Sequence, residues 1–430
     1  MNDRNNYYYT GGLAELVPNP SPLTYSFLVH WFTGRNSVGK AMRLLGLPHM
    51  PSDEPLLVLN DSDLVVDGQT EAQALYANTL FSYTSSDTIQ HTPKLILDYS
   101  KVLHLQHWKP TIQILLRQSN WIAKPDAAVK HAQKLLGSIP TVTTTKDIHA
   151  LDDILGNDVW PRVIAIGLLC EFFSHLYKNQ RDSSFTSKDW FLLSLVDQYE
   201  VKEHRRTFQD YIHEYGLRAD KDYDLATPRW YEIPEVIQKR IQSSQALAAN
   251  ETKQAEENDQ TRTLGELMMI RMEAKKKALF FIDALRQSII KTLKTDDIGS
   301  HTREALYGEK KKASKEHIES PPVSLPLVNS GKGTGISAGK STGLALKNVK
   351  STSSIPEGAI CIFPNASPEF SHQFPKCAGI VFLTGGRTSH GAIVAREYGI
   401  PAVIDAQAKG IADGAMVTID GTTGEWSVTV

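Results

Sequence analysis

The stretch GGRTSHGAIVAREYGIPAV (residues 385–403) places one histidine between a glycine-rich turn and a short helical pattern. The run AGIVFL just before it (residues 378–383) has the apolar, β-branched character of a buried strand. Two glycines then permit a tight turn, a threonine and a serine can cap a helix, and a later glycine and proline end it. The pattern therefore predicts a strand, a turn and a helix in succession, with His390 in the first helical turn.

This position of His390 suits phosphoryl chemistry. A helix N-terminus offers unpaired N–H groups and a partial positive charge, which together favour a bound phosphate. Neutral imidazole is a nucleophile near pH 7, and a ring nitrogen can carry a phosphoryl group covalently. An alternative stays open, in which His390 is only a capping or packing residue. The residues that would support a phosphoryl group directly precede the histidine and are Gly385, Gly386, Arg387, Thr388 and Ser389.

Short apolar or alternating runs on both sides of this stretch predict further strands. They are AICIF (residues 359–363), PAVID (401–405), AMVTID (415–420) and EWSVTV (425–430). The segment GTTG between the last two runs is typical of a hairpin loop. We therefore expect residues 333–430 to form one small α+β domain, since about 100 residues suffice for a compact domain.

The chain before this domain has a different periodicity. Residues 1–318 are predicted to form a large, mainly α-helical domain, because apolar residues recur three or four positions apart in two long segments. One stripe is Val163, Ile166, Leu169, Phe173 and Leu176, and the other is Ala274, Ala278, Phe281, Leu285, Ile289 and Leu293. Residues 319–332, which are rich in Pro, Gly and Ser, are predicted to be a linker or hinge between the two domains.

Composition excludes several classes of function. The 46 basic residues nearly balance the 48 acidic residues, so no strong overall field indicates a nucleic-acid or membrane partner. The chain has three cysteines in 430 residues and no CxxC pair, which fits a reducing compartment. The pair His104 and His107 in HLQHWKP is weak evidence for a metal against an ordinary surface role, so we expect no metal site. The N-terminus lacks the pattern of a signal peptide, and the longest apolar run is too short to span a bilayer. We therefore expect a cytoplasmic location.

Residues 333–430 resemble the swivelling phosphohistidine domain of the phosphoenolpyruvate-utilising enzymes, the family of phosphoenolpyruvate synthase, pyruvate phosphate dikinase and rifampicin phosphotransferase. The resemblance lies in GTGISAGKSTG, IPEGAICIFPNASPEF, GGRTSHGAIVAREYGIPAV and IADGAMVTIDGTTGEW. It implies a small β/β/α domain that swings between two distant active sites. It also implies that His390 accepts the phosphoryl group and that Thr388 is a hydrogen-bonding neighbour.

Two stretches of the helical part resemble rifampicin phosphotransferase-like proteins. One is NPSPLTYSFL (residues 19–28), and the other is YIHEYGLRADKDYDLATPRWYEIP (residues 211–234), which has Leu217 where the family has histidine. Arg218, Arg229 and Trp230 could line an acceptor pocket, because guanidinium groups suit anions and an indole suits a flat ligand. The alternative for these three residues is buried salt bridges and a core tryptophan.

The family resemblance implies a split phosphotransferase of the dikinase type. The family's ATP-grasp domain has no counterpart in this sequence, so we expect ATP and Mg²⁺ on a separate ATP-grasp subunit and no cofactor bound by this chain alone. One phosphoryl group would pass from ATP through His390 to a small-molecule acceptor, and ATP would yield AMP and phosphate. The alternative is a non-catalytic regulatory or binding protein built on a degenerate mobile domain.

Overall fold

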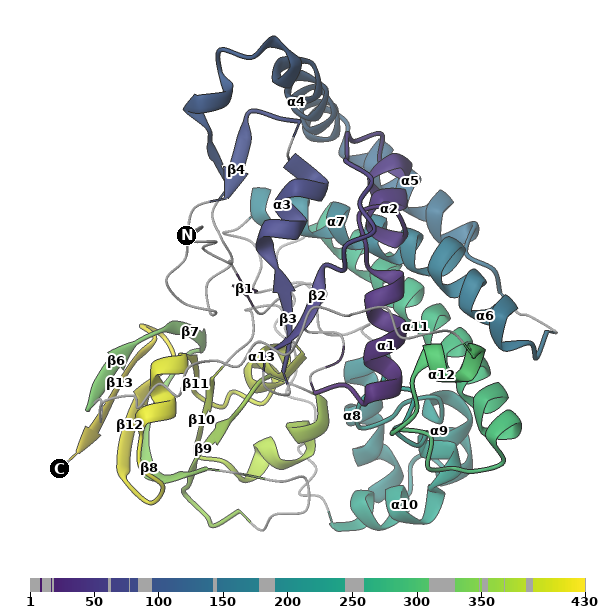
Figure 1. Cartoon of the computed structure of the whole chain (residues 1–430). Helices are drawn as coiled ribbons and strands as arrows, with labels where there is room; N and C mark the ends of the chain where they lie inside the picture. Colours follow the sequence, from purple (N-terminus) through teal and green to yellow (C-terminus); the bar gives the residue numbers. More distant parts are fainter. Residues whose placement is uncertain are drawn as a thin grey trace.

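The chain has a helical part and a smaller β part that follows it, as its computed structural model shows (Figure 1). The predicted fold class, α+β with a large helical domain before a small β domain, is confirmed. The structure describes residues 8–9, 17, 19–60, 63–76, 78–83, 95–141, 145–177, 190–243, 259–308, 329–347, 349, 355–366, 368–383 and 390–429.

The helical part is built from helices of very different length. The longest is α11 (Asp259–Leu293), whose 35 residues extend over about 52 Å at 1.5 Å per residue. The others are α1 (Pro22–Trp31), α2 (Ser37–Leu44), α3 (Gly68–Tyr76), α4 (Trp108–Ala123), α5 (Pro125–Gly137), α6 (Ile148–Ile154), α7 (Trp160–Leu176), α8 (Trp190–Lys202), α9 (Phe208–Tyr215), α10 (Pro234–Ser243) and α12 (Arg303–Tyr307).

The core of the helical part is centred on α7, which packs against α2, α5 and α11. The two predicted apolar stripes lie on α7 and α11 and face this core, except that Leu176 at the end of α7 is 41% exposed. Leu169 and Phe173 of α7 are fully buried, as are Ala278 and Leu285 of α11. The 3.6-residue period of the apolar residues therefore predicted correctly which face of each helix is buried.

Small sheets near the N-terminus are a feature that the helical prediction for residues 1–318 did not include. Strands β1 (Tyr8–Tyr9), β2 (Leu57–Asn60) and β3 (Asp63–Asp67) form an antiparallel sheet, and β4 (Phe81–Tyr83) pairs with β5 (Leu95–Leu97). The run LVLNDSDLVVD contains two short β-branched segments around a polar turn, which is typical of a hairpin. A mainly helical region allows such small sheets, but the prediction did not place them, because it weighed only the long helical periodicity.

The β part is one mixed sheet with the strand order β6-β13-β12-β8-β9-β10-β11-β7. The pairs β8/β9, β9/β10 and β10/β11 are parallel, and the other pairs are antiparallel. The strands are β6 (Ser330–Lys332), β7 (Thr334–Ser337), β8 (Lys340–Leu346), β9 (Ile360–Phe363), β10 (Gly379–Phe382), β11 (Ala402–Ile404), β12 (Met416–Asp420) and β13 (Glu425–Thr429). All five predicted strands of this region are present, and the predicted GTTG loop joins β12 to β13.

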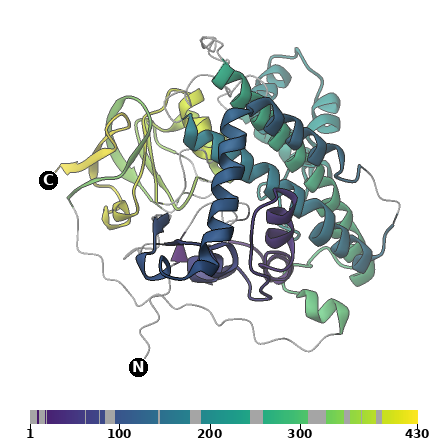
Figure 2. The same ribbon diagram turned by 90° about the horizontal axis from the view of Figure 1, so that it is seen from above.

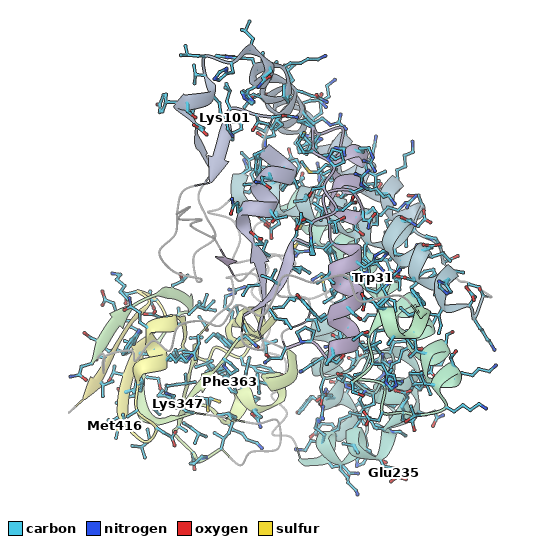
Figure 3. All side chains as sticks on the ribbon, viewed as in Figure 1. Trp31, Lys101, Glu235, Lys347, Phe363 and Met416 are labelled. Carbon is cyan, nitrogen blue, oxygen red and sulfur yellow. The ribbon has the colours of Figure 1, made fainter. Side chains whose placement is uncertain are left out.

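The two parts have separate cores. The helical core contains buried residues from Val17 to Ile298, whereas both clusters of the β part lie between Ile336 and Trp426. Seen from above, the helices and the sheet occupy opposite sides of the molecule (Figure 2). Side chains such as Trp31 and Phe363 belong to these two interiors (Figure 3).

The end of the predicted linker needs a correction. Its last residues, Ser330–Lys332, form strand β6, which pairs with β13. The Pro- and Gly-rich composition indicated a connection between domains. These three residues instead pair with β13, and composition alone cannot predict such a pairing. Residues 319–328 of the linker lie outside the described residues, so the hinge itself stays a prediction.

Within the described part of the chain, none of the helices combines the length and apolar character that a membrane span requires.

Candidate functional site: the start of helix α13 and the buried motif of the helical part

Helix α13 (His390–Glu397) begins at the predicted phosphoryl carrier. It lies between β10 and β11 in the sequence and packs against β7, β11 and the helical turn η7 (Pro368–Lys376). Ala392, Val394 and Ala395 are buried in the cluster beneath it. The predicted strand and helix are thus present, and His390 is the first residue of the helix, whereas the predicted turn falls on residues 384–389, outside the described residues.

Gly391 lets the start of α13 approach the loop after β9 closely. Its N–H donates to the carbonyl oxygen of Ala366 at 3.0 Å. A Cβ atom at position 391 would lie 3.0 Å from both Cα and the carbonyl oxygen of Ala366. Glycine is therefore required by a close backbone approach, and this contact holds the backbone next to His390 in place.

The end of α13 is as well defined as its start. Ile400 N–H donates to Ala395 O at 2.9 Å and Gly399 N–H to Arg396 O at 3.0 Å, which is the Schellman pattern. Gly399 has a φ of +62°, the left-handed conformation that this motif uses. The predicted glycine stop is present.

The residues that directly precede the predicted phosphoryl carrier are not among those that the structure describes. Gly385, Gly386, Arg387, Thr388 and Ser389 lie outside the described residues, and for His390 only the backbone is described. The assignment of His390 as carrier and of these five residues as its support therefore stays a prediction.

Arg218 is a buried ion-pair residue. Its Nε lies 3.0 Å from both carboxylate oxygens of Asp222, and Nη1 donates to Ser194 Oγ at 2.6 Å. The side chains of Arg218 and Asp222 are only 2% and 5% exposed. The guanidinium also lies 5.1 Å from the centroid of the Trp230 ring, within the range of a cation–π contact.

Arg229 and Trp230 are also interior residues. Arg229 Nη1 donates to the carbonyl oxygen of Asp222 at 2.5 Å, and Arg229 is fully buried. Trp230 stacks on Tyr211 with ring centroids 6.2 Å apart and belongs to the helical core. This geometry corresponds to the alternative of buried ion pairs and a core tryptophan. The interpretation of these residues as acceptor contacts stays a prediction. Arg218 and Arg229 are buried and bonded to Asp222, whereas Trp230 Nε1 is buried without a hydrogen-bond partner.

The same motif joins the two family-like stretches of the helical part. Asp224 accepts hydrogen bonds from Ser21 Oγ at 2.6 Å and from Thr24 Oγ1 at 2.5 Å. Thr24 Oγ1 in turn accepts from the backbone N–H of Leu225 at 2.7 Å. Residues about 200 positions apart thus form one polar cluster, and the sequence analysis missed this contact although both stretches were noted.

A second polar group lies where η6 (Trp230–Glu232) meets α11. Tyr231 OH donates to Asp283 Oδ1 at 3.0 Å, and Arg229 Nε lies 3.8 Å from the same oxygen. Burial raises the pKa of Asp283, and the positive charge of Arg229 opposes that shift. Burial and the charge of Asp283 raise the pKa of Tyr231. The tyrosine is therefore a neutral donor to this carboxylate at physiological pH.

The remaining residues that the sequence singled out lie elsewhere. Leu217, at the position of the family histidine, is half-buried beside Arg218. His104 and His107 form an edge-to-face pair with ring centroids 6.1 Å apart. In the part of the chain that the structure describes, no group of three or more His, Cys, Asp or Glu side chains is placed to hold a metal ion.

Comparison with known families gives a match in each part of the chain. Residues 355–424, in the β part, match the family of the PEP-utilising enzyme mobile domain. More particularly, residues 107–291 match the family of the rifampicin phosphotransferase fourth domain. The resemblance to PEP-utilising enzymes is thus confirmed for these two segments.

Individual relatives are similar to the same two parts of the chain. The chain is 24% identical to the rifampicin phosphotransferase of Bacillus subtilis over 462 residues, covering 87% of this chain and 51% of that protein. It is 36% identical to the "Probable phosphoenolpyruvate synthase" of Archaeoglobus fulgidus over 118 residues, covering 27% of this chain and 15% of that protein. The chain therefore spans about half, or much less, of the length of these relatives. Among solved structures, a UPF0107 protein solved by NMR aligns with 24% of this chain and 99% of its own at 16% identity, with a TM-score of 0.20.

Proposed function

We propose that this chain is a phosphotransferase subunit that carries a phosphoryl group on His390. The observation that carries the proposal is the match of residues 355–424 to the mobile domain of PEP-utilising enzymes, with His390 at the start of α13. Relatives named as phosphotransferases and phosphoenolpyruvate synthases support this reaction class.

The proposed reaction has three displacement steps. A ring nitrogen of His390 attacks the β-phosphorus of ATP, so that an N–P bond forms, the P–O bond to the α-phosphate breaks and AMP leaves. Water then attacks the terminal phosphorus of the diphosphoryl group, and its P–O bond breaks to release one phosphate. The acceptor oxygen finally attacks the phosphorus that is bound to nitrogen, the N–P bond breaks, and the imidazole recovers its electron pair while the acceptor loses its proton. We place the ATP and Mg²⁺ sites on a separate ATP-grasp polypeptide and a small-molecule acceptor on the helical part.

The N-terminal geometry of α13 is suited to the first step. The partial positive charge of a helix N-terminus favours the phosphate anion and stabilises the phosphorylated histidine. Of the first N–H groups of α13, that of Gly391 is already bonded to Ala366 O. This hydrogen bond acts on the helix backbone rather than on the phosphoryl group, so it positions His390 and does not bind the ligand.

A direct experiment is phosphorylation by an ATP-grasp polypeptide in the presence of ATP and Mg²⁺. We expect the chain to gain one phosphoryl group by intact mass spectrometry, and the product to be acid-labile and alkali-stable. His390→Ala should abolish the gain, because the nucleophile is removed. A matched control is His213→Ala, which removes an exposed imidazole on α9 and should leave labelling unchanged. Full labelling of His390→Ala would refute the carrier assignment.

A non-catalytic role is the second candidate, and two observations favour it. Leu217 replaces the family histidine, and Arg218, Arg229 and Trp230 are buried. The two candidates differ in turnover: a phosphotransferase forms AMP from ATP in proportion to added acceptor, whereas a binding protein with an unphosphorylated His390 forms none.

A further inference from the structure

Helix α12 is held on the helical part although none of its five residues is buried. It is the last described helix of this part, and Figure 1 shows it beside α1. Before it, Ile298 is fully buried in the helical core, and the carbonyl oxygen of Gly299 accepts from the N–H of Leu23 at 3.2 Å. Residues 300–308, by contrast, contain no buried residue. The burial of apolar side chains, which holds most helices in place, is therefore small here.

The polar contacts that hold α12 meet at one buried carboxylate. Asp152 on α6 is 3% exposed. Its Oδ1 accepts a hydrogen bond from Trp31 Nε1 of α1 at 2.6 Å. Its Oδ2 accepts from Arg303 Nε at 2.8 Å and from Tyr307 OH at 2.9 Å, and both donors belong to α12. One carboxylate oxygen thus bonds to the core of the helical part, and the other bonds to α12.

Further contacts of the same two side chains strengthen this attachment. The ring of Tyr307 stacks on His149 of α6 with centroids 3.9 Å apart, and the Arg303 guanidinium lies 4.6 Å from the centroid of the Tyr307 ring. The backbone N–H of Arg303 donates to Ser26 Oγ of α1 at 2.8 Å. Burial and the charge of Asp152 raise the pKa of Tyr307, so the phenol is a neutral donor at physiological pH. Helix α12 is therefore fixed to both α1 and α6.

The charge of Asp152 explains why this attachment persists. A buried carboxylate is costly without a cation, so buried charges are normally paired. Arg303 supplies this cation from α12. If α12 left the surface, Asp152 would keep Trp31 Nε1 as a donor but would lose its ion pair with Arg303. The helical part therefore retains α12 even though the helix buries little apolar surface.

The attachment also determines how much chain lies between the two parts. With α12 docked, the helical part extends to Gly308, whose φ of +65° ends the helix. If α12 detached, residues 300–308 would join the connection, because so short a helix is not stable alone in water. A free chain of nine residues has a root-mean-square end-to-end distance of about 17 Å and an extended length of about 30 Å.

We propose that Asp152 is the docking residue for α12, and that this docking sets the point from which the β part is tethered. Asp152, Arg303 and Tyr307 are positioning residues, because they act on the tether and not on a reacting atom. The benefit for a phosphoryl carrier rests on the proposed function, since a carrier has to reach its sites in the correct geometry. The docking itself uses no residue of α13 and does not depend on that function.

Two variants release α12 in different ways. Asp152→Asn keeps an oxygen for Trp31 Nε1 but replaces Oδ2 by an amide nitrogen, which cannot accept from the two donors of α12. The double variant Arg303→Met with Tyr307→Phe removes both donors and leaves Asp152 unchanged. Either variant tests the proposal by itself if the other does not fold.

A similar cluster between α8 and α9 supplies a matched control. Arg206 and Tyr215 both bond to Asp197, and the Arg206 guanidinium lies 5.4 Å from the centroid of the Tyr215 ring. The double variant Arg206→Met with Tyr215→Phe removes the same chemical groups as the double variant of α12. It should lower the melting temperature without moving α12.

Spin labels on the full chain measure the result by double electron–electron resonance. The first pair, Ala305→Cys with Val236→Cys, reports the position of α12 on the helical part. The second pair, Val236→Cys with Met416→Cys, reports the position of the β part relative to the helical part. All three labelled positions are exposed, whereas the three native cysteines are buried and stay unlabelled.

We expect a narrow distribution of first-pair distances in the parent chain and in the control. Both releasing variants should widen that distribution by about 17 Å, because residues 300–308 then form a free chain. They should also extend the second-pair distances by up to about 30 Å.

Two results would overturn the proposal. A narrow first-pair distribution in the releasing variants would show that Asp152 does not hold α12. A widened first-pair distribution with unchanged second-pair distances would show that α12 does not set the tether. Neither measurement uses ATP or His390, so a chain that is never phosphorylated can still show the docking, and the two proposals fail separately.

Discussion

At the scale of single residues, burial and partners decide what a charged side chain does. Arg218 and Arg229 have the residue type expected for anion recognition, yet each is held in the interior by aspartate side chains or backbone carbonyls. Half-buried Leu217 lies directly beside Arg218 in the chain. The family-like motif therefore has a structural role, which is to connect α1, η6 and α11 through hydrogen bonds that are buried at α1 and partly exposed at α11.

Arg218→Ala tests this structural role. The change leaves the carboxylate of Asp222 buried without its cation, and breaking a buried pair in this way costs about 3–5 kcal/mol of unfolding free energy. Urea denaturation followed by circular dichroism measures the loss. Arg205→Ala is the matched control, because its pair with Glu200 is solvent-exposed and is worth at most about 1 kcal/mol. Equal, small losses in both variants would contradict a structural role for Arg218.

At the scale of elements, the position and the bounds of α13 depend on what its two ends contact. The C-terminal end is a Schellman motif that the glycine at position 399 makes possible. The N-terminal end is held by the close approach of Gly391 to Ala366, which also determines where the backbone of His390 lies. The loop after β9 is thus part of the support of the proposed site, although it is distant from His390 in sequence.

Gly391→Ala should disturb this element. The added methyl group would meet backbone atoms of Ala366 at 3.0 Å, and overpacking of this kind costs about 1–3 kcal/mol. We expect a lower unfolding midpoint for the β part and slower phosphorylation of His390. Gly137→Ala at the end of α5 is the control, since no atom lies within 4 Å of the new Cβ. If Gly391→Ala is as stable and as readily phosphorylated as the control, the contact does not position the helix.

At the scale of the whole molecule, two separately cored parts are joined by a connection that includes residues 309–328. Two chemistries at separate places require a carrier that travels, and such motion uses a few residues between rigid bodies. Separate cores permit this motion, because neither hydrophobic interior has to open when the parts move relative to each other.

Limited trypsin digestion of the full chain should therefore cut first between the two parts. Lys310, Lys311, Lys312 and Lys315 supply cleavage sites there. We expect a stable C-terminal fragment of about 100 residues, the size of an independent domain, by mass spectrometry over a time course. Initial cleavage inside α7 or α11, or uniform resistance of the chain, would be inconsistent with two independently folded parts.

Several features could be predicted from the sequence because they depend on neighbours along the chain. The strands around His390, the helix that it begins and the glycine that ends this helix follow from turn residues and local periodicity. The apolar stripes of α7 and α11 follow from the helical period. The family motifs also predicted the mobile-domain match of residues 355–424.

Other features were decided only by the tertiary structure. Asp224 meets Ser21 and Thr24 across about 200 residues, and β6 extends the sheet with residues whose composition indicated a linker. The same holds for the burial of Arg218 and Arg229. A sequence pattern determines which faces of an element are apolar and where it ends, because those properties are local. Which distant groups satisfy a buried charge or an edge strand depends on how the elements pack, and no local pattern records that.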